Sequence, residues 1–132
     1  MHGETDLDTL LCQLKPTVRP ETFVFCTVAN AAYSDLATTE PFASVQEEEG
    51  LTIILVQAQA DGADLPYNGT FRCITLTVHS SLEAVGLTAV ISTKLAQHQI
   101  SANVIAGFHH DHIFVPADQV ESALQALASL TP

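Results

Sequence analysis

The spacing of hydrophobic residues over the first sixty positions predicts one short helix followed by three strands. Four leucines recur at helical spacing before Pro16, which ends the helix: Leu7, Leu10, Leu11 and Leu14. Residues 22–28 are rich in β-branched and aromatic side chains and predict a buried strand. Residues 42–46 and 51–57 flank an acidic turn that ends in glycine, which is typical of a hairpin.

A turn-rich segment divides the chain in two. Residues 58–69 contain two Gly, one Pro and three Asp or Asn residues, a composition that favours a connection over a regular element. We therefore expect an N-terminal half over residues 1–62 and a C-terminal half over residues 63–132.

The hydrophobic pattern of the C-terminal half predicts the order β-α-β-β-α. Strands are expected over residues 71–78, 100–106 and 111–115, and a closing helix begins at Pro116. The helix after the first strand shows an apolar stripe formed by Leu87, Val90, Ile91 and Leu95.

This order is an α+β, ferredoxin-like arrangement without its last strand, which leaves one sheet edge open. We expect a strand of the N-terminal half, over residues 22–28 or 51–57, to complete the sheet, with the helices on one sheet face. We also expect a homodimer, because a small domain gains buried surface by pairing.

The composition excludes several kinds of partner. The 132 residues include four Lys and Arg against fifteen Asp and Glu, and a formal net charge of −11 repels phosphate backbones and anionic lipids. We expect no nucleic acid and no membrane as partners. The chain has neither a long apolar run nor a basic, apolar leader, and its odd number of cysteines without Cys-x-x-Cys spacing favours reduced core thiols. We therefore expect a cytoplasmic protein.

The turn before the second helix carries the most informative chemistry. Backbone amides in the first turn of a helix are unpaired donors at the positive end of the helix dipole, and Gly86 allows a ligand to approach them closely. The natural ligand is a small carboxylate. An ammonium group on the same ligand would be bound by carboxylates of the protein. The expected ligand-binding residues are Ser80, Ser81, Glu83, Val85, Gly86, Leu87, Asn103 and Asp111.

Two other interpretations of this turn stay open. Gly86 permits close helix packing and Ser80 is a possible helix cap, neither of which requires a ligand. If the backbone dihedrals of Gly86 are accessible to valine, Gly86→Val should abolish ligand binding and leave the fold intact.

The histidines favour neither a metal site nor catalysis. His109, His110 and His112 are close in sequence, but neighbouring residues of a strand point to opposite faces, so only His110 and His112 are expected on one side. We expect no metal. Ser80 beside His79 lacks the third group of a catalytic triad, and no phosphate-binding or dinucleotide motif occurs, so we expect neither an enzyme nor a cofactor.

The segment His-Ser-Ser-Leu-x-Ala-Val-Gly-Leu-Thr-Ala at 79–89 resembles the ACT-domain superfamily of amino-acid-binding regulatory modules. It is similar to small bacterial tandem-ACT proteins and to the ACT repeats of the cytosolic arginine sensor. In ACT domains a glycine at the junction of first strand and first helix lets the ligand approach the backbone, and Gly86 occupies that place. The resemblance implies an amino-acid ligand; the alternative is an assembly domain that binds none.

Overall fold

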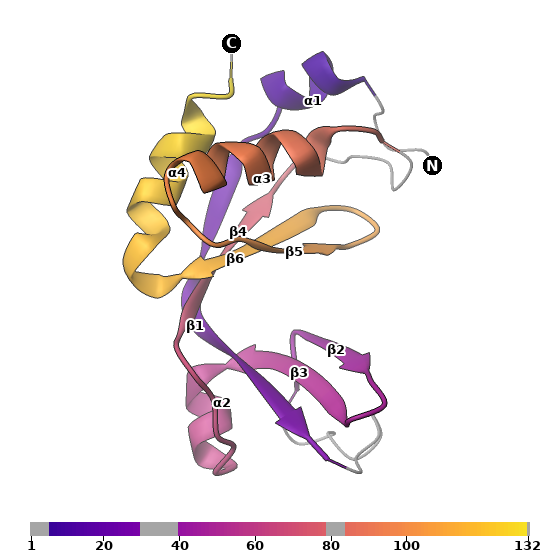
Figure 1. Cartoon of the computed structure of the whole chain (residues 1–132), viewed down its shortest axis with the longest axis vertical. Coiled ribbons are helices and arrows are strands. Elements are labelled where there is room, and N and C mark those ends of the chain that lie inside the picture. Colours follow the sequence, from indigo (N-terminus) through magenta and orange to yellow (C-terminus); the bar gives the residue numbers. More distant parts are fainter. Residues whose placement is uncertain (1–5, 30–39, 79–83, 132) are drawn as a thin grey trace. The chain divides into compact units, whose positions relative to one another are not determined.

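The computed structural model describes residues 6–29, 40–78 and 84–131. These residues belong to two compact units (Figure 1). The split unit contains the chain up to Pro20 and from Arg72 onward, and the central unit spans Glu21–Phe71. Within the described ranges, no helix is long and apolar enough to cross a membrane.

The sheet of the split unit has the strand order β1-β4-β6-β5. Its strands are β1 (Pro16–Val28, of which the first residues belong here), β4 (Phe71–Leu76), β5 (Asn103–Ala106) and β6 (Asp111–Pro116). Strands β5 and β6 form an antiparallel hairpin. Strand β1 therefore lies beside β4 and fills the sheet edge that the sequence leaves open.

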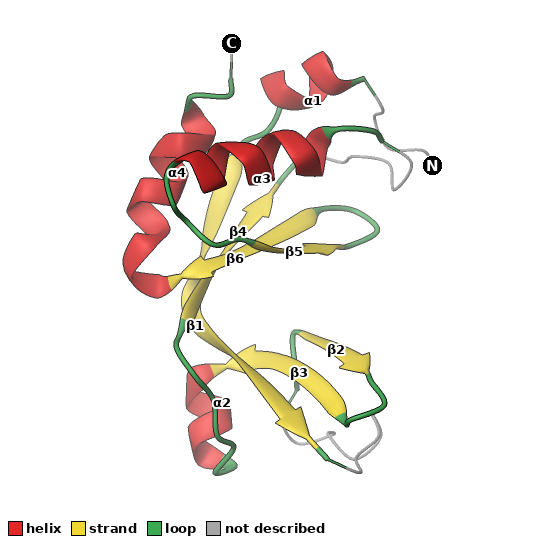
Figure 2. Ribbon diagram, in the orientation of Figure 1, coloured by secondary structure: helices red, strands yellow, loops and turns green. Residues whose placement is uncertain are grey.

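Three α-helices cover one face of this sheet, as the ribbon in Figure 2 shows. They are α1 (Leu7–Cys12), α3 (Leu87–Gln97) and α4 (Val120–Ala128), which follows the short 3-10 helix η2 (Ala117–Gln119). In α3 the buried residues recur every four positions, which forms one apolar stripe: Leu87, Ile91 and Leu95. These side chains share a single core with Ile74 and Leu76 of β4 and with the apolar residues of α1 and α4.

The start of α1 is fixed by its N-cap residue, Asp6. Its carboxylate accepts hydrogen bonds from the hydroxyl (2.7 Å) and the backbone amide (3.0 Å) of Thr9. Both bonds favour the charged carboxylate and lower the pKa of Asp6. Gln13 follows α1 and begins the turn into β1.

The central unit contains a hairpin and a short helix. Strands β2 (Ala43–Gln46) and β3 (Leu51–Val56) are antiparallel, and β3 also pairs with the second part of β1, where Phe23 lies opposite Val56. Helix α2 (Gln57–Gly62) follows directly. The unit has its own apolar core, which includes Val24, Cys26, Ile53, Leu55 and Ala60.

The structure confirms the α+β fold class and the β-α-β-β-α order of the C-terminal half. Three expectations were wrong in detail. Strand β1 begins at Pro16 and not at residue 22, helix α2 occupies part of the segment expected to be a connection, and Cys12 is exposed while Cys26 and Cys73 are buried. Ala58 and Ala60 favour helix more than the flanking Gly and Pro oppose it, and Ala60 is fully buried.

Candidate functional site

The turn into α3 depends on the backbone conformation of Gly86. This residue is the N-cap of α3 with φ +99°, a conformation that glycine adopts and L-residues rarely do. Its carbonyl accepts from the amide of Val90 at 2.9 Å, and no side chain of the described residues caps the helix. The remaining first-turn amides have no partner within the helix, which is the property that suits them to an anion.

Valine cannot adopt φ +99° without strain, so the condition attached to the Gly86→Val test is not met. A Cβ added at Gly86 would also contact Leu7 of α1 at 3.4 Å. Gly86 is therefore needed for the backbone turn into α3 whether or not a ligand binds there. The site must be tested by substitutions at other residues.

The structure brings together only part of the expected ligand-binding set. Ser80, Ser81 and Glu83 lie outside the described residues, as does His79. Val85 is 84% exposed, whereas the side chain of Leu87 is buried in the core and leaves only its amide for a ligand.

Asn103 and Asp111 lie on opposite faces of the β5–β6 hairpin. Asn103 is opposite Phe114, and Asp111 is opposite Ala106, at the other end of β5. Because residues alternate along β6, Asp111 shares the helix-covered face of Ile113, while Asn103 shares the other face with Phe114. Asn103 and Asp111 are therefore not placed to contact the same small ligand.

A pocket of about 310 Å³ lies where β4 ends and the chain leaves toward α3. We call it the strand-end pocket, and its lining residues are Gln13, Lys15, Thr77 and Val78. Gln13 and Lys15 come from the turn between α1 and β1, and Thr77 and Val78 directly follow β4. Sequence reasoning missed Gln13, Lys15 and Thr77, because only the fold brings the α1–β1 turn to the end of β4.

Lys15 has an unusual backbone conformation in this pocket. Its φ is +41°, in the left-handed region, where a residue with a Cβ is strained. Two hydrogen bonds from Thr77 hold it there, since the Lys15 carbonyl accepts from the Thr77 hydroxyl (2.9 Å) and the Thr77 amide (3.5 Å). Strained non-glycine residues are concentrated at functional sites, which makes Lys15 a candidate ligand-binding residue.

Electrostatics supports the same assignment. The side chain of Lys15 is exposed, it forms no ion pair with a described residue, and the described residues that line the strand-end pocket include no carboxylate. The chain has fifteen acidic and four basic residues, so the described part of this pocket differs in charge from the chain as a whole. The arrangement suits an anion that comes from solution.

The hairpin tip flanks the other side of the end of β4. The Nδ1 atom of His110 lies 3.5 Å from the carbonyl oxygen of Val78. The ring of His109 stands edge-on to Phe108, whose side chain is 64% exposed. Lys15 and His110 therefore come from the two neighbouring segments on either side of one strand end.

His112 takes part in a polar chain on the sheet face opposite the helices. Thr75 places its hydroxyl 3.0 Å from Nδ1 of His112 and accepts from Nε of Arg19 at 3.4 Å. Burial, and then the positive charges of Arg19 and His110, lower the pKa of His112, while Asp111 acts in the opposite direction. Within residues 6–29, 40–78 and 84–131, no three His, Cys, Asp or Glu side chains are placed to hold a metal ion.

The fold and the site define the class of protein. One ACT-domain family model matches residues 2–72 and a second ACT-domain model matches residues 69–129. The chain therefore belongs to the ACT-domain family and contains two ACT domains in tandem. The resemblance of the segment at 79–89 is confirmed at the level of the family.

Solved structures agree with this assignment. A Vibrio cholerae protein of unknown function, described as a possible transport protein, is 50% identical, with a TM-score of 0.87 and 96% of each chain covered. The ligand-free regulatory subunit of aspartate kinase from Thermus thermophilus shares the fold at 8% identity, with a TM-score of 0.61 over 89% of this chain and 97% of that one.

Escherichia coli aspartokinase III, solved with aspartate and ADP, also shares the fold at 14% identity and a TM-score of 0.65. The match covers 87% of this chain and 32% of the kinase, so the likeness concerns one part of that enzyme. No curated protein matches the chain.

Proposed function

We propose that this protein is a regulatory ACT protein that binds a free amino acid through its α-carboxylate, at the strand-end pocket and the turn around Gly86. The observation that carries the proposal is Lys15, a strained residue whose ammonium has no acidic neighbour among the described residues that line the pocket. Membership of the ACT family supports a regulatory role of the amino-acid-binding type.

The neighbours by fold support the regulatory part of the proposal. They include a regulatory subunit of aspartate kinase and an aspartokinase in complex with aspartate. In our proposal this chain likewise acts by binding and not by catalysis. An amino acid that stabilises one conformation transmits the signal by shifting the population of states, which needs no reacting group.

Each part of the ligand has a proposed partner. The α-carboxylate accepts from the Lys15 ammonium and from the amides of Val85, Gly86 and Leu87, which combines a point charge with a helix N-terminus. The Thr77 hydroxyl and the Gln13 amide complete the polar wall. We keep Ser80 and Ser81 as polar contacts, and Glu83 and Asp111 as partners of the ligand ammonium. Asn103 lies at the other end of the hairpin from Asp111 and is not part of the proposed site.

The organisation of the molecule is also proposed. We keep the halves 1–62 and 63–132 as the two repeats, a homodimer as the working assembly, and the cytoplasm as its location. None of the three cysteines forms a disulfide with a described residue, which suits a reducing compartment, and the strands at the ends of the strand order offer a sheet edge to a second copy.

A thermal-shift screen of the twenty common amino acids tests the proposal. A ligand that binds only the folded state stabilises it by about 2.7 kcal/mol at a concentration of about 100 times Kd. At least one amino acid should raise the Tm of the parent, and Lys15→Met should weaken its binding by roughly tenfold or more, because a charged hydrogen-bond partner is lost. Lys15→Arg should restore most of the affinity.

The matched control is Lys94→Met, which removes a lysine from α3 and should leave the amino-acid response unchanged. An equal response in the parent and in Lys15→Met would show that the amino acid binds elsewhere. No response to any amino acid would favour an assembly domain without a ligand.

A further inference from the structure

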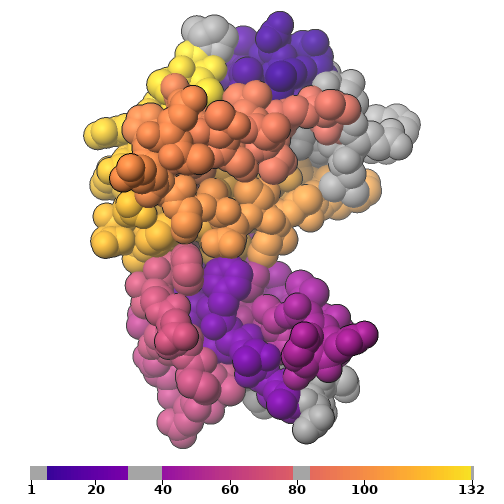
Figure 3. All heavy atoms as spheres, in the orientation of Figure 1, coloured from indigo at the N-terminus to yellow at the C-terminus, as the bar shows by residue number. Residues whose placement is uncertain are grey.

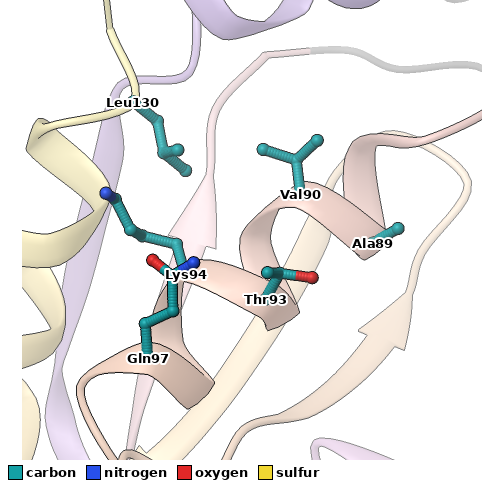
Figure 4. A pocket seen from close by; sticks show the side chains of 6 residues that line it. All are labelled: Ala89, Val90, Thr93, Lys94, Gln97 and Leu130. Atoms are coloured by element: carbon teal, nitrogen blue, oxygen red, sulfur yellow. The ribbon is translucent and has the colours of Figure 1, made fainter.

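A second pocket lies on the outer side of α3, within the split unit (Figure 4). We call it the α3 pocket; it measures about 350 Å³ and is lined by Ala89, Val90, Thr93, Lys94, Gln97 and Leu130. In the space-filling view of Figure 3, α3 forms part of the surface of this unit. The volume lies at the lower end of the range of roughly 300–1,000 Å³ that small-molecule sites show.

The residues that line the α3 pocket form an apolar part and a polar part. Val90, Ala89 and the partly buried Leu130 supply aliphatic surface, and Leu130 also packs against the main core of the unit. Thr93, Lys94 and Gln97 supply a hydroxyl, an ammonium and an amide. Figure 4 shows Val90, Lys94 and Gln97 rising from α3 on the side of Leu130.

The positive charge in this pocket has no counterpart among the described residues. Lys94 is half-buried, it forms no ion pair with any residue that the structure describes, and none of the described lining residues is acidic. Its place in the last turn of α3 suits the helix dipole, which accounts for a cation at this position. The dipole does not account for the aliphatic wall beside it. A cation beside an apolar hollow matches a ligand that has one negative charge and one apolar part.

We propose that the α3 pocket binds a small monocarboxylate with an aliphatic tail. The carboxylate accepts from the Lys94 ammonium and the Gln97 amide, and the tail lies against Val90 and Leu130, where burial of each methylene favours binding. The site is separate from the strand-end pocket and does not depend on the proposed amino-acid ligand.

A second copy of the chain fits this pocket less well than an anion does. A two-fold interface places the same surface on both copies, so it would bring two Lys94 ammonium groups into one apolar contact. Burying two like charges together is costly, and none of the described lining residues supplies an acid to offset them. Charge complementarity therefore selects the small anion.

The test is a titration of the full chain with octanoate, followed by NMR of the side-chain and backbone amides. The parent should show saturable shifts at Val90, Lys94, Gln97 and Leu130. Lys94→Met should bind octanoate roughly tenfold or more weakly, and Lys94→Arg within a few-fold of the parent. Octylamine, which has the same tail and the opposite charge, should not bind at this pocket.

Lys15→Met is the control that separates the two sites, and it should leave the octanoate shifts at Val90, Lys94, Gln97 and Leu130 unchanged. Three outcomes would overturn the proposal: no saturable shift with octanoate, equal affinity of the parent and Lys94→Met, or octanoate shifts that disappear in Lys15→Met. If self-association of the parent buries the residues of the α3 pocket, a second copy and not a small ligand occupies it, which would also overturn the proposal.

Discussion

Thr77 determines the conformation of Lys15 through two hydrogen bonds to one carbonyl oxygen, across 62 residues of sequence. Thr77→Val removes the hydroxyl donor at 2.9 Å, while the weaker amide bond at 3.5 Å remains. We expect the free energy of unfolding to fall by roughly 0.5–1.5 kcal/mol, the net value of one hydrogen bond. Thr77→Ser keeps the hydroxyl and should retain the parent stability in urea titrations; equal losses in both variants would contradict this role.

The same residue should matter for the ligand. Without its hydroxyl bond, the Lys15 backbone has less reason to stay in the left-handed region, so the ammonium is less well placed. Thr77→Val should therefore weaken amino-acid binding, and Thr77→Ser should not. Calorimetric titration of both variants with an amino acid that stabilises the parent checks this expectation.

His112 should make the stability of the protein depend on pH. Its pKa is lowered in the folded state, so the unfolded chain binds the proton more tightly. The free energy of unfolding should therefore be unaffected by this group above its ordinary pKa of about 6.5 and should decrease as pH falls through and below that value. His112→Gln keeps a hydrogen-bonding side chain and removes the titration. A parent and a variant with the same pH dependence between pH 7.5 and 5 would show that another group is responsible.

Single residues show where sequence reasoning succeeds and where it stops. Gly86 could be assigned to the start of a helix because the apolar stripe of α3 begins directly after it. Lys15 could not be assigned to a site, because nothing near it in sequence indicates that Thr77 bonds to its carbonyl. Asn103 and Asp111 were grouped by topology, but the register of the hairpin places them on opposite faces.

At the scale of elements, the backbone at Gly86 controls the start of α3. Gly86→Ala forces an L-residue to φ +99°, and we expect a loss of roughly 1–2 kcal/mol in the free energy of unfolding. Among the described residues, the added Cβ meets only Leu7 at 3.4 Å, an ordinary contact, so we attribute the loss to strain and not to collision.

Gly62→Ala is the matched control. Gly62 ends α2, has no positive φ, and a Cβ there meets no atom of a described residue within 4 Å. This change should stabilise the fold by roughly 0.4–1 kcal/mol, because alanine restricts the unfolded chain more than glycine does. Thermal unfolding of both variants decides the matter; equal effects would mean that φ at Gly86 does not determine the cost.

The elements that the sequence predicted well are those with a strong period. The β2–β3 hairpin, α3 and the β5–β6 hairpin all follow from the spacing of apolar residues and from their turns. The early start of β1 did not follow, because Pro16 and Pro20 indicate a break, whereas pairing with β4 continues the strand across them. Long-range pairing thus overrides a local signal.

At the scale of the whole molecule, a homodimer is the open prediction. Strand β5 ends the strand order of the split unit and β2 ends that of the central unit, and sheet edges of this kind pair readily. Sedimentation velocity over a wide concentration range should give a dimer mass. A monomer at the highest concentration would contradict the dimer without affecting either proposed pocket.

The central claim is that an amino acid binds at the end of β4, next to the start of α3. The most direct measurement is an amide NMR titration of the parent chain with the amino acid that stabilises it most. We predict saturable shifts that are largest at Lys15, Thr77, Val78, Gly86 and Leu87 and that are lost in Lys15→Met. Shifts confined to other residues, or the absence of saturable shifts with any of the twenty amino acids, would contradict the account.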